Sequence, residues 1–192
     1  DAIVPFTHFA LLTDSYARRH DVSAEDIALV AVKNHRNGAA NPNAQRQQVR
    51  TLDEVLGGRP VSGSLTSLQC CPVGEGAAAV VVASETAIKR LAVDSSKPVR
   101  VTASASCVEV AGQTGADALI TEKTIADALG QAGHQAGDLD VIELHDAFTI
   151  EELQYVDAMG LTKPGESVHW LRDGAFDIGG RVAVSPSGGL IA

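Results

Sequence analysis

Short apolar runs alternate along this chain with segments that carry helix signals. The clearest run is 76–83, Gly-Ala-Ala-Ala-Val-Val-Val-Ala, which contains no polar side chain. An uninterrupted run of this length is typical of a strand covered on both faces. Apolar or alternating patterns predict further strands at 99–110, 139–144 and 181–184. Strands that alternate with helices predict an α/β fold built in layers.

Six segments are expected to be helical, because they combine apolar residues at helical spacing with capping or stop residues. Their ranges are 7–20, 24–37, 52–56, 85–92, 122–129 and 150–159. The expected N-caps are Ser23, Thr51, Ser84, Thr121 and Thr149. Glu54 and Glu152 each follow a capping Thr by three residues, which predicts two capping boxes.

Charge and composition exclude several classes of function. The chain has 15 Lys and Arg against 24 Asp and Glu, a net charge of −9, which argues against general nucleic-acid binding. Aromatic residues make up 4%, too few for a base-stacking platform. Arg46, Arg50 and Arg59 are the nearest candidates for a local basic patch. No apolar stretch reaches the roughly 18 to 20 residues of a membrane span.

Cysteine and histidine usage argues against a disulfide framework and a metal site. Of the three cysteines, Cys70 and Cys71 are adjacent, and Cys107 falls in an expected strand, where we expect a core position. No pair of histidines has metal-ligand spacing. We therefore expect a cytoplasmic protein without a bound metal. Cys71 remains open to two interpretations, a reactive thiol or a small packed side chain.

The segment 143–148, Glu-Leu-His-Asp-Ala-Phe, is the sharpest candidate for a functional site. It joins an expected strand to an expected helix, so His145 and Asp146 would project from the carboxyl end of the strand. Ligands bind at that edge in open α/β sheets. A histidine there can donate a hydrogen bond to an oxyanion or relay a proton. The alternative is structural: Asp146 orients the loop and His145 is its partner.

A second candidate is the Ser-Pro-Ser-Gly-Gly segment at 185–189. Small residues after a strand let a backbone approach a ligand closely. The segment lacks the spacing of a dinucleotide-binding or phosphate-binding loop. A tight turn is the alternative interpretation.

Several segments, taken in order, resemble the thiolase superfamily, and within it the sterol-carrier-protein-X, or lipid-transfer-protein, branch. They are 32–38, 41–44, 59–61, 65–66, 71–79, 143–148, 180–181 and 186–189. The resemblance implies two similar α/β halves in an αβαβα layered fold that is incomplete in this chain. Residues 1–96 would end the N-terminal half with its loop region, and 97–192 would begin a truncated C-terminal half. The polar segment 94–98 would join them.

The resemblance also implies chemistry on acyl-CoA, by Claisen condensation or thiolysis. The family's nucleophilic cysteine and its Gly-His-Pro histidine are expected outside this chain, so the segment alone would be inactive. His145 would form an oxyanion hole as the one catalytic residue. The residues implied to bind substrate or coenzyme A are Phe9, Cys71, Ala147, Phe148, Ser187, Gly188 and Gly189. Coenzyme A would be the substrate carrier, with no covalently bound cofactor.

Two other functions stay open within the same resemblance. One is a lyase, a retro-aldolase that cleaves a steroid side-chain acyl-CoA with a small partner protein of the OB-fold and zinc-ribbon type. The other is a non-catalytic subunit that binds coenzyme A or lipid. The family's habit implies a homodimer that acts in lipid or sterol metabolism, including steroid degradation.

Overall fold

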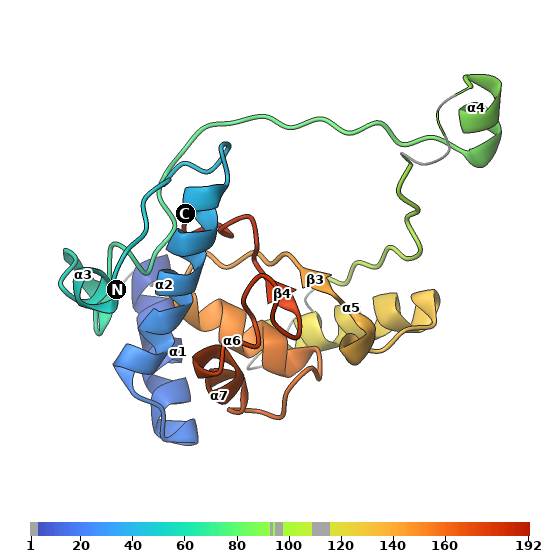
Figure 1. The fold of residues 1–192 in the computed structure, drawn as a ribbon. Helices are drawn as coiled ribbons and strands as arrows, with labels where there is room; N and C mark the ends of the chain where they lie inside the picture. The colour runs from blue at the N-terminus through green and yellow to red at the C-terminus, as the bar shows by residue number, and fades with distance from the viewer. Residues whose placement is uncertain (1–3, 93, 95–97, 109–115) are drawn as a thin grey trace.

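The computed structural model describes residues 4–92, 94, 98–108 and 116–192. Four helices pack against one another in the body of the fold (Figure 1): α1 (Pro5–His20), α2 (Ala24–Ala40), α6 (Thr149–Ala158) and α7 (Ser167–Arg172). Ile27 and Val30 of α2 and Ile150 and Leu153 of α6 are fully buried. The stripe of apolar residues at helical spacing on α2 therefore faces the core, as the sequence predicted.

The strands are short and form two separate pairs. β1 (Pro60–Ser62) and β2 (Leu65–Thr66) are antiparallel, whereas β3 (Val141–Ile142) and β4 (Ala183–Val184) are parallel. The remaining elements are α3 (Leu52–Leu56), α4 (Glu85–Arg90), α5 (Ala116–Ala132) and the 3-10 helix η1 (Ala136–Asp138). The described chain thus mixes helices and strands, and β3 with β4 supplies the parallel pairing expected of an α/β fold.

The prediction of a buried strand at 76–83 is wrong for this structure. These residues are exposed, and Val81 keeps 95% of its accessible surface. The chain leaves the body as an extended segment, with α4 at its far end (Figure 1). Residues 99–108 are likewise outside any strand. An extended segment becomes a strand only when a neighbour satisfies its backbone N–H and C=O groups, and among the described residues no strand pairs with either segment.

Two expectations in this part of the chain need separate comment. Cys107 is half-buried rather than a core residue, with its Sγ 3.9 Å from Asp127 Oδ2. The boundary predicted between 96 and 97 falls at residues outside the described ranges, as do residues 109–110 of the second expected strand. The boundary stays a prediction.

Three of the predicted helix caps are confirmed. Ser23, Thr51 and Ser84 each accept a hydrogen bond from the backbone N–H three residues later. The capping box at Thr51 is complete, because Glu54 accepts the Thr51 N–H at 2.8 Å. Such boxes depend on residues within one turn, so the sequence alone suffices to predict them.

The other two predicted caps are wrong. Thr121 lies inside α5, which already begins at Ala116. At α6 the N-cap is Phe148, whose N–H donates to Glu151 at 3.0 Å. Thr149 is therefore the first residue of the helix. Glu152 takes no part in the cap and is buried in the interior.

No helix among the described residues is long and apolar enough to cross a membrane.

Candidate functional site

The loops that follow β3 and β4 meet at one edge of the fold. The two strands run parallel, with Val141 opposite Ala183 and Ile142 opposite Val184. Just past the pair, Ser185 N–H donates to Ile142 O at 2.7 Å. Because the carboxyl ends of parallel strands lie at the same edge, the segments 143–148 and 185–190 emerge together. This is the edge at which α/β folds bind ligands.

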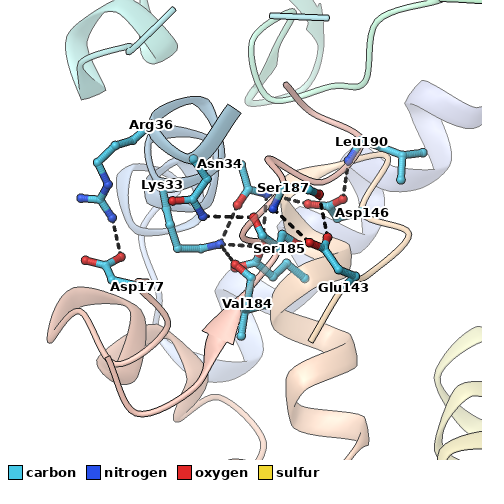
Figure 2. Close-up of polar contacts among 12 residues, drawn as sticks. Lys33, Asn34, Arg36, Glu143, Asp146, Asp177, Val184, Ser185, Ser187 and Leu190 are labelled. Carbon is cyan, nitrogen blue, oxygen red and sulfur yellow. Dashed lines mark hydrogen bonds and ion pairs between the residues drawn. The ribbon is translucent and has the colours of Figure 1, made fainter. Parts of the chain in front are cut away.

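Side chains of the first loop hold the backbone of the second (Figure 2). Glu143 accepts two hydrogen bonds from Ser187, from its backbone N–H at 3.0 Å and its hydroxyl at 2.8 Å. Asp146 Oδ1 accepts the Leu190 N–H at 2.7 Å. The two candidate segments of the sequence are therefore one structural unit.

The glycines of the second loop serve both a turn and a close approach. Gly188 donates to Ser185 O at 3.0 Å and has a φ of 104°, and Gly189 has a φ of 62°. A Cβ at Gly189 would overlap the carboxylate of Asp146, and one at Gly188 would lie 2.9 Å from the Cα of Gly38. Glycine is required here because left-handed backbone and tight contact coincide. The turn interpretation of this segment is correct.

The cysteine segment runs alongside the end of the first loop. Cys71 N–H donates to Ala147 O at 2.8 Å, and Cys70 forms an antiparallel bridge with Phe148. These backbone contacts place Cys71 and Ala147 next to each other. Both side chains are half-buried.

Burial raises the pKa of both neighbouring thiols. The pKa of Cys70 rises to about 11 and that of Cys71 also rises, with desolvation as the largest cause in each. A nucleophilic cysteine needs a lowered pKa, so that the thiolate is present near neutral pH. These two residues therefore fit the packed interpretation rather than the reactive one.

An aromatic surface adjoins the first loop. Phe9 of α1 stacks on Phe148, with ring centroids 4.3 Å apart and planes at 19°. Phe6 meets the same Phe148 ring edge-on at 6.0 Å and is 47% exposed. The stack brings together two of the predicted substrate-binding residues that lie 139 positions apart in the chain.

The neighbouring side chains of His145 and Asp146 differ in their exposure to solvent. His145 is exposed, whereas Asp146 is fully buried. The imidazole is thus available to a ligand, and the carboxylate anchors the loop from below. The structural interpretation of the 143–148 segment holds for Asp146, which orients the loop, and the catalytic role of His145 stays a prediction.

Sequence reasoning missed the residues beneath Asp146. Lys33 of α2 is 3% exposed and donates to Glu152 at 3.1 Å, and to Asn34 Oδ1 and Val184 O, both at 2.6 Å. Asn34 in turn donates to Asp146 Oδ2 at 2.6 Å. A signal was present: Asn34 lies seven residues after Ile27, on the apolar stripe of the helix, where a polar side chain must find a buried partner.

Two members of the candidate basic patch, Arg46 and Arg50, have partners in the fold, whereas Arg59 is exposed. Arg46 is half-buried in the fold and donates to the carbonyls of Cys70 and Ile191 at 3.1 and 3.0 Å. Arg50 lies 3.5 Å from Glu54. Arg46 therefore ties the cysteine segment to the second loop. Within the described ranges, no group of three His, Cys, Asp or Glu side chains could hold a metal ion.

Comparison with known proteins shows which families the chain resembles. Residues 105–192 match the thiolase C-terminal domain-like family model. The benzoylsuccinyl-CoA thiolase subunit BbsB of Thauera aromatica is 39% identical over 96% of this chain and 50% of its own length. Sterol carrier protein 2 of Gallus gallus is 36% identical over 96% of this chain and 35% of its own length. The chain thus spans half or less of the length of these two relatives.

A solved structure shares the fold. The Ltp2-ChsH2(DUF35) aldolase matches with a TM-score of 0.76 and 21% identity, over 95% of this chain and 50% of that one. This likeness supports the fold alone. With the sequence relatives and the family model, it confirms the resemblance to the thiolase superfamily on which the site residues were chosen: residues 105–192 match the thiolase C-terminal domain-like model, and sterol carrier protein 2 is among the relatives of nearly the whole chain.

Proposed function

We propose that this chain is part of an acyl-CoA acyltransferase of the thiolase type, in which His145 stabilises the negative charge on a thioester oxygen. The observation that carries the proposal is the place of His145. It is exposed on a loop at the carboxyl edge of β3, next to a buried anchor and near an apolar aromatic surface. An imidazole N–H at this position can meet a developing oxyanion.

The reaction would be a Claisen condensation or its reverse. In the condensation, a base removes a proton from the α-carbon of one acyl-CoA, and the charge gathers on the thioester oxygen. The carbanion attacks an acyl group held as a thioester on a cysteine, a carbon–carbon bond forms, and the cysteine leaves as a thiolate. Because the pKa values of Cys70 and Cys71 are raised, we assign the nucleophile to another part of the protein.

The surroundings of His145 suit a pantetheine-linked substrate. Half-buried Phe9 and exposed Phe6, which pack on the buried Phe148 ring, supply apolar surface for an acyl or pantetheine chain. Ala147 and Cys71 are small residues next to Phe148. Ser187, Gly188 and Gly189 form the turn that supports the edge of the site. Coenzyme A is then the carrier of the substrate.

The test is a thiolysis assay of the full protein with a β-ketoacyl-CoA. Replacing an oxyanion-hole donor lowers kcat by about 100- to 1,000-fold, so His145→Ala should lose activity on that scale while retaining its melting temperature. His169→Ala is the matched control, because His169 is an exposed histidine on α7. Full activity of His145→Ala contradicts the proposed role.

A lyase is the second candidate, because the solved structure that shares this fold is named as an aldolase. A retro-aldol cleavage of a β-hydroxyacyl-CoA also passes through an enolate that His145 could stabilise, but it needs no thiolate. The substrate would be a steroid side-chain acyl-CoA, and an OB-fold and zinc-ribbon partner would complete the enzyme. Release of a ketone from that substrate, without thiolysis of a β-ketoacyl-CoA, decides for the lyase.

The third candidate is a subunit that binds coenzyme A or lipid without catalysis. Binding in the absence of either reaction would favour it. Coenzyme A that fails to raise the melting temperature at concentrations well above micromolar would weaken all three functions, because a ligand of the native state must stabilise it. A homodimer and a cytoplasmic location belong to the same proposal, and the three described cysteines, all free thiols, are consistent with a reducing compartment.

A further inference from the structure

A buried cluster under the site holds one cation and two carboxyl groups. Lys33 is 3% exposed, and Asp146 and Glu152 are fully buried. Among the described residues, the titratable groups that face Glu152 are Lys33 of α2 and Asp146 of the loop before α6. With all three ionised, the cluster would carry a net charge of −1 without access to water. A buried charge without a partner is costly, and a carboxyl group avoids that cost by taking up a proton.

The hydrogen bonds favour Asp146 over Glu152 as the ionised carboxylate. Lys33 donates to Asn34 Oδ1 at 2.6 Å, which turns the amide nitrogen of Asn34 toward Asp146 Oδ2, also at 2.6 Å. The other oxygen of Asp146 accepts the Leu190 N–H at 2.7 Å (Figure 2). Since both oxygens face N–H donors, a proton on Asp146 would point at a donor. The orientation of Asn34 cannot reverse, because its nitrogen would then face the Lys33 ammonium.

One carboxyl oxygen of Glu152 can carry a proton without facing a hydrogen-bond donor. Its Oε2 accepts from Lys33 at 3.1 Å and from Asn34 at 3.2 Å. Its Oε1 is buried with no hydrogen-bond partner, and the buried hydroxyl of Ser185, which faces Glu152, also has none. An acid proton on Oε1 would remove the charge and supply a donor next to an unused acceptor.

We propose that Glu152 is a protonated carboxylic acid at neutral pH, so that the positive charge of Lys33 balances the negative charge of Asp146. The cluster is then neutral. Glu152 and Lys33 are positioning residues, which act through Asp146 on the His145 loop and on the turn at 185–190. Their consequence for activity rests on the proposed function, but the protonation of Glu152 does not.

The directions in which burial shifts the two pKa values agree with the hydrogen-bond geometry. Burial raises the pKa of Glu152, although Lys33 opposes the shift. Burial, followed by the nearby Glu152, raises the pKa of Asp146 to about 7. One proton shared by two coupled carboxyl groups raises both values, and the donors around Asp146 assign that proton to Glu152.

Two amide substitutions separate the roles of the carboxyl groups. Glu152→Gln imitates the protonated acid, so we expect the fold, and an unfolding equilibrium constant at pH 7 within about threefold of the unmodified protein. Asp146→Asn places an amide NH2 against an N–H donor, and we expect the unfolding constant to rise by roughly tenfold to a hundredfold. Glu75→Gln, at an exposed glutamate, is the control. Equal damage from both substitutions, a reversed order, or failure of Glu152→Gln to fold overturns the proposal.

The pH dependence of the unfolding equilibrium constant distinguishes a change in protonation from a loss of packing. A carboxyl group with a raised native pKa stabilises the fold below its unfolded pKa and loses that contribution as pH rises through the native value. The unfolding constant of the unmodified protein should therefore rise toward a limit of about tenfold per pH unit in that window, and Glu152→Gln should show a shallower slope. Identical slopes overturn the proposal.

Carboxyl NMR of the glutamate side chains tests the proton directly. One signal should keep the chemical shift of an acid at pH 7 and be absent from Glu152→Gln. If no such signal exists, Glu152 is ionised and the proposal fails. These measurements need no substrate. If the acid signal is present but the protein neither binds coenzyme A nor turns over acyl-CoA, the proposed function fails and the protonation stands.

Discussion

The carboxylate of Asp146 accepts the backbone N–H of Leu190 at 2.7 Å, and this contact joins two loops that lie 44 residues apart. It ties the segment that carries His145 to the glycine turn after β4. Because Asp146 is fully buried, the contact is protected from water and should be strong for a charged acceptor. The geometry of the candidate site therefore depends on a residue that no ligand would touch.

Gly189→Ala should destabilise the protein by about 1–3 kcal/mol, because the position combines a φ of 62° with close contact to Asp146. Chemical denaturation would measure the change. Gly130→Ala is the control, since a Cβ there meets open space inside α5, and a helical alanine should stabilise by about 0.5–1 kcal/mol. Tolerance of alanine at position 189 would contradict the close approach described here.

Asp26 at the start of α2 forms an ion pair with Arg172 of α7, and this pair should contribute to stability at neutral pH but not in acid. Desolvation works against ionised Asp26, but the hydrogen bonds from Arg172 and Ser23 outweigh it and hold its pKa below the usual value. The contribution is present above the unfolded pKa, near 4, and is lost as pH falls through the lower native value. Asp26→Asn should cost about 1 kcal/mol at pH 7 and less at pH 2.

Urea unfolding at the two pH values measures this difference. Asp14→Asn is the control, because it removes a carboxylate from the neighbouring helix α1. An equal cost of Asp26→Asn at both pH values would show that the cap, and not the charge, supplies the stability.

Phe9→Ala should weaken binding of a long-chain acyl-CoA by about 3- to 10-fold, because it removes part of the apolar surface that the acyl chain would cover. The dissociation constant of the full protein for acyl-CoA and for coenzyme A itself would be compared. Leu11→Ala, at a 61% exposed residue of the same helix, should leave both unchanged. A loss confined to coenzyme A would place Phe9 outside the acyl surface.

Arg46→Lys should cost about 1–2 kcal/mol, because a lysine cannot reach the carbonyls of Cys70 and Ile191 with the planar fork that arginine supplies. Thermal unfolding checks the result. Arg50→Lys is the matched control, since its contact with Glu54 at 3.5 Å is a surface pair worth little. Equal effects would remove the special role of Arg46.

Part of the site could be predicted from the sequence, because some of its features depend only on neighbouring residues or on the order of strand and helix. A strand followed by a helix places the intervening loop at a carboxyl edge, so the position of His145 at that edge could be predicted. The caps at Ser23, Thr51 and Ser84 follow from side chains within one turn of the helix. The family resemblance then selected Phe9 and Cys71, which no local pattern distinguishes from core residues.

Other features depend on which segments lie next to each other in space. The apolar run 76–83 has the composition of a buried strand, yet it is exposed because strand formation needs a paired neighbour. At α6 the sequence predicted Glu152 in the capping box, whereas the fold places Glu151 there and brings Glu152 into contact with Lys33.

The sequence by itself determined the helix caps at Ser23, Thr51 and Ser84 and the edge at which His145 lies, since these follow from short-range spacing. Only the tertiary structure decided that Lys33, Asn34, Asp146 and Glu152 share one buried cluster. The spacing of these four residues along the chain does not indicate that they lie together. Burial makes an unpaired charge costly, so these side chains find their partners only when α2, α6 and the loop between β3 and α6 have packed together.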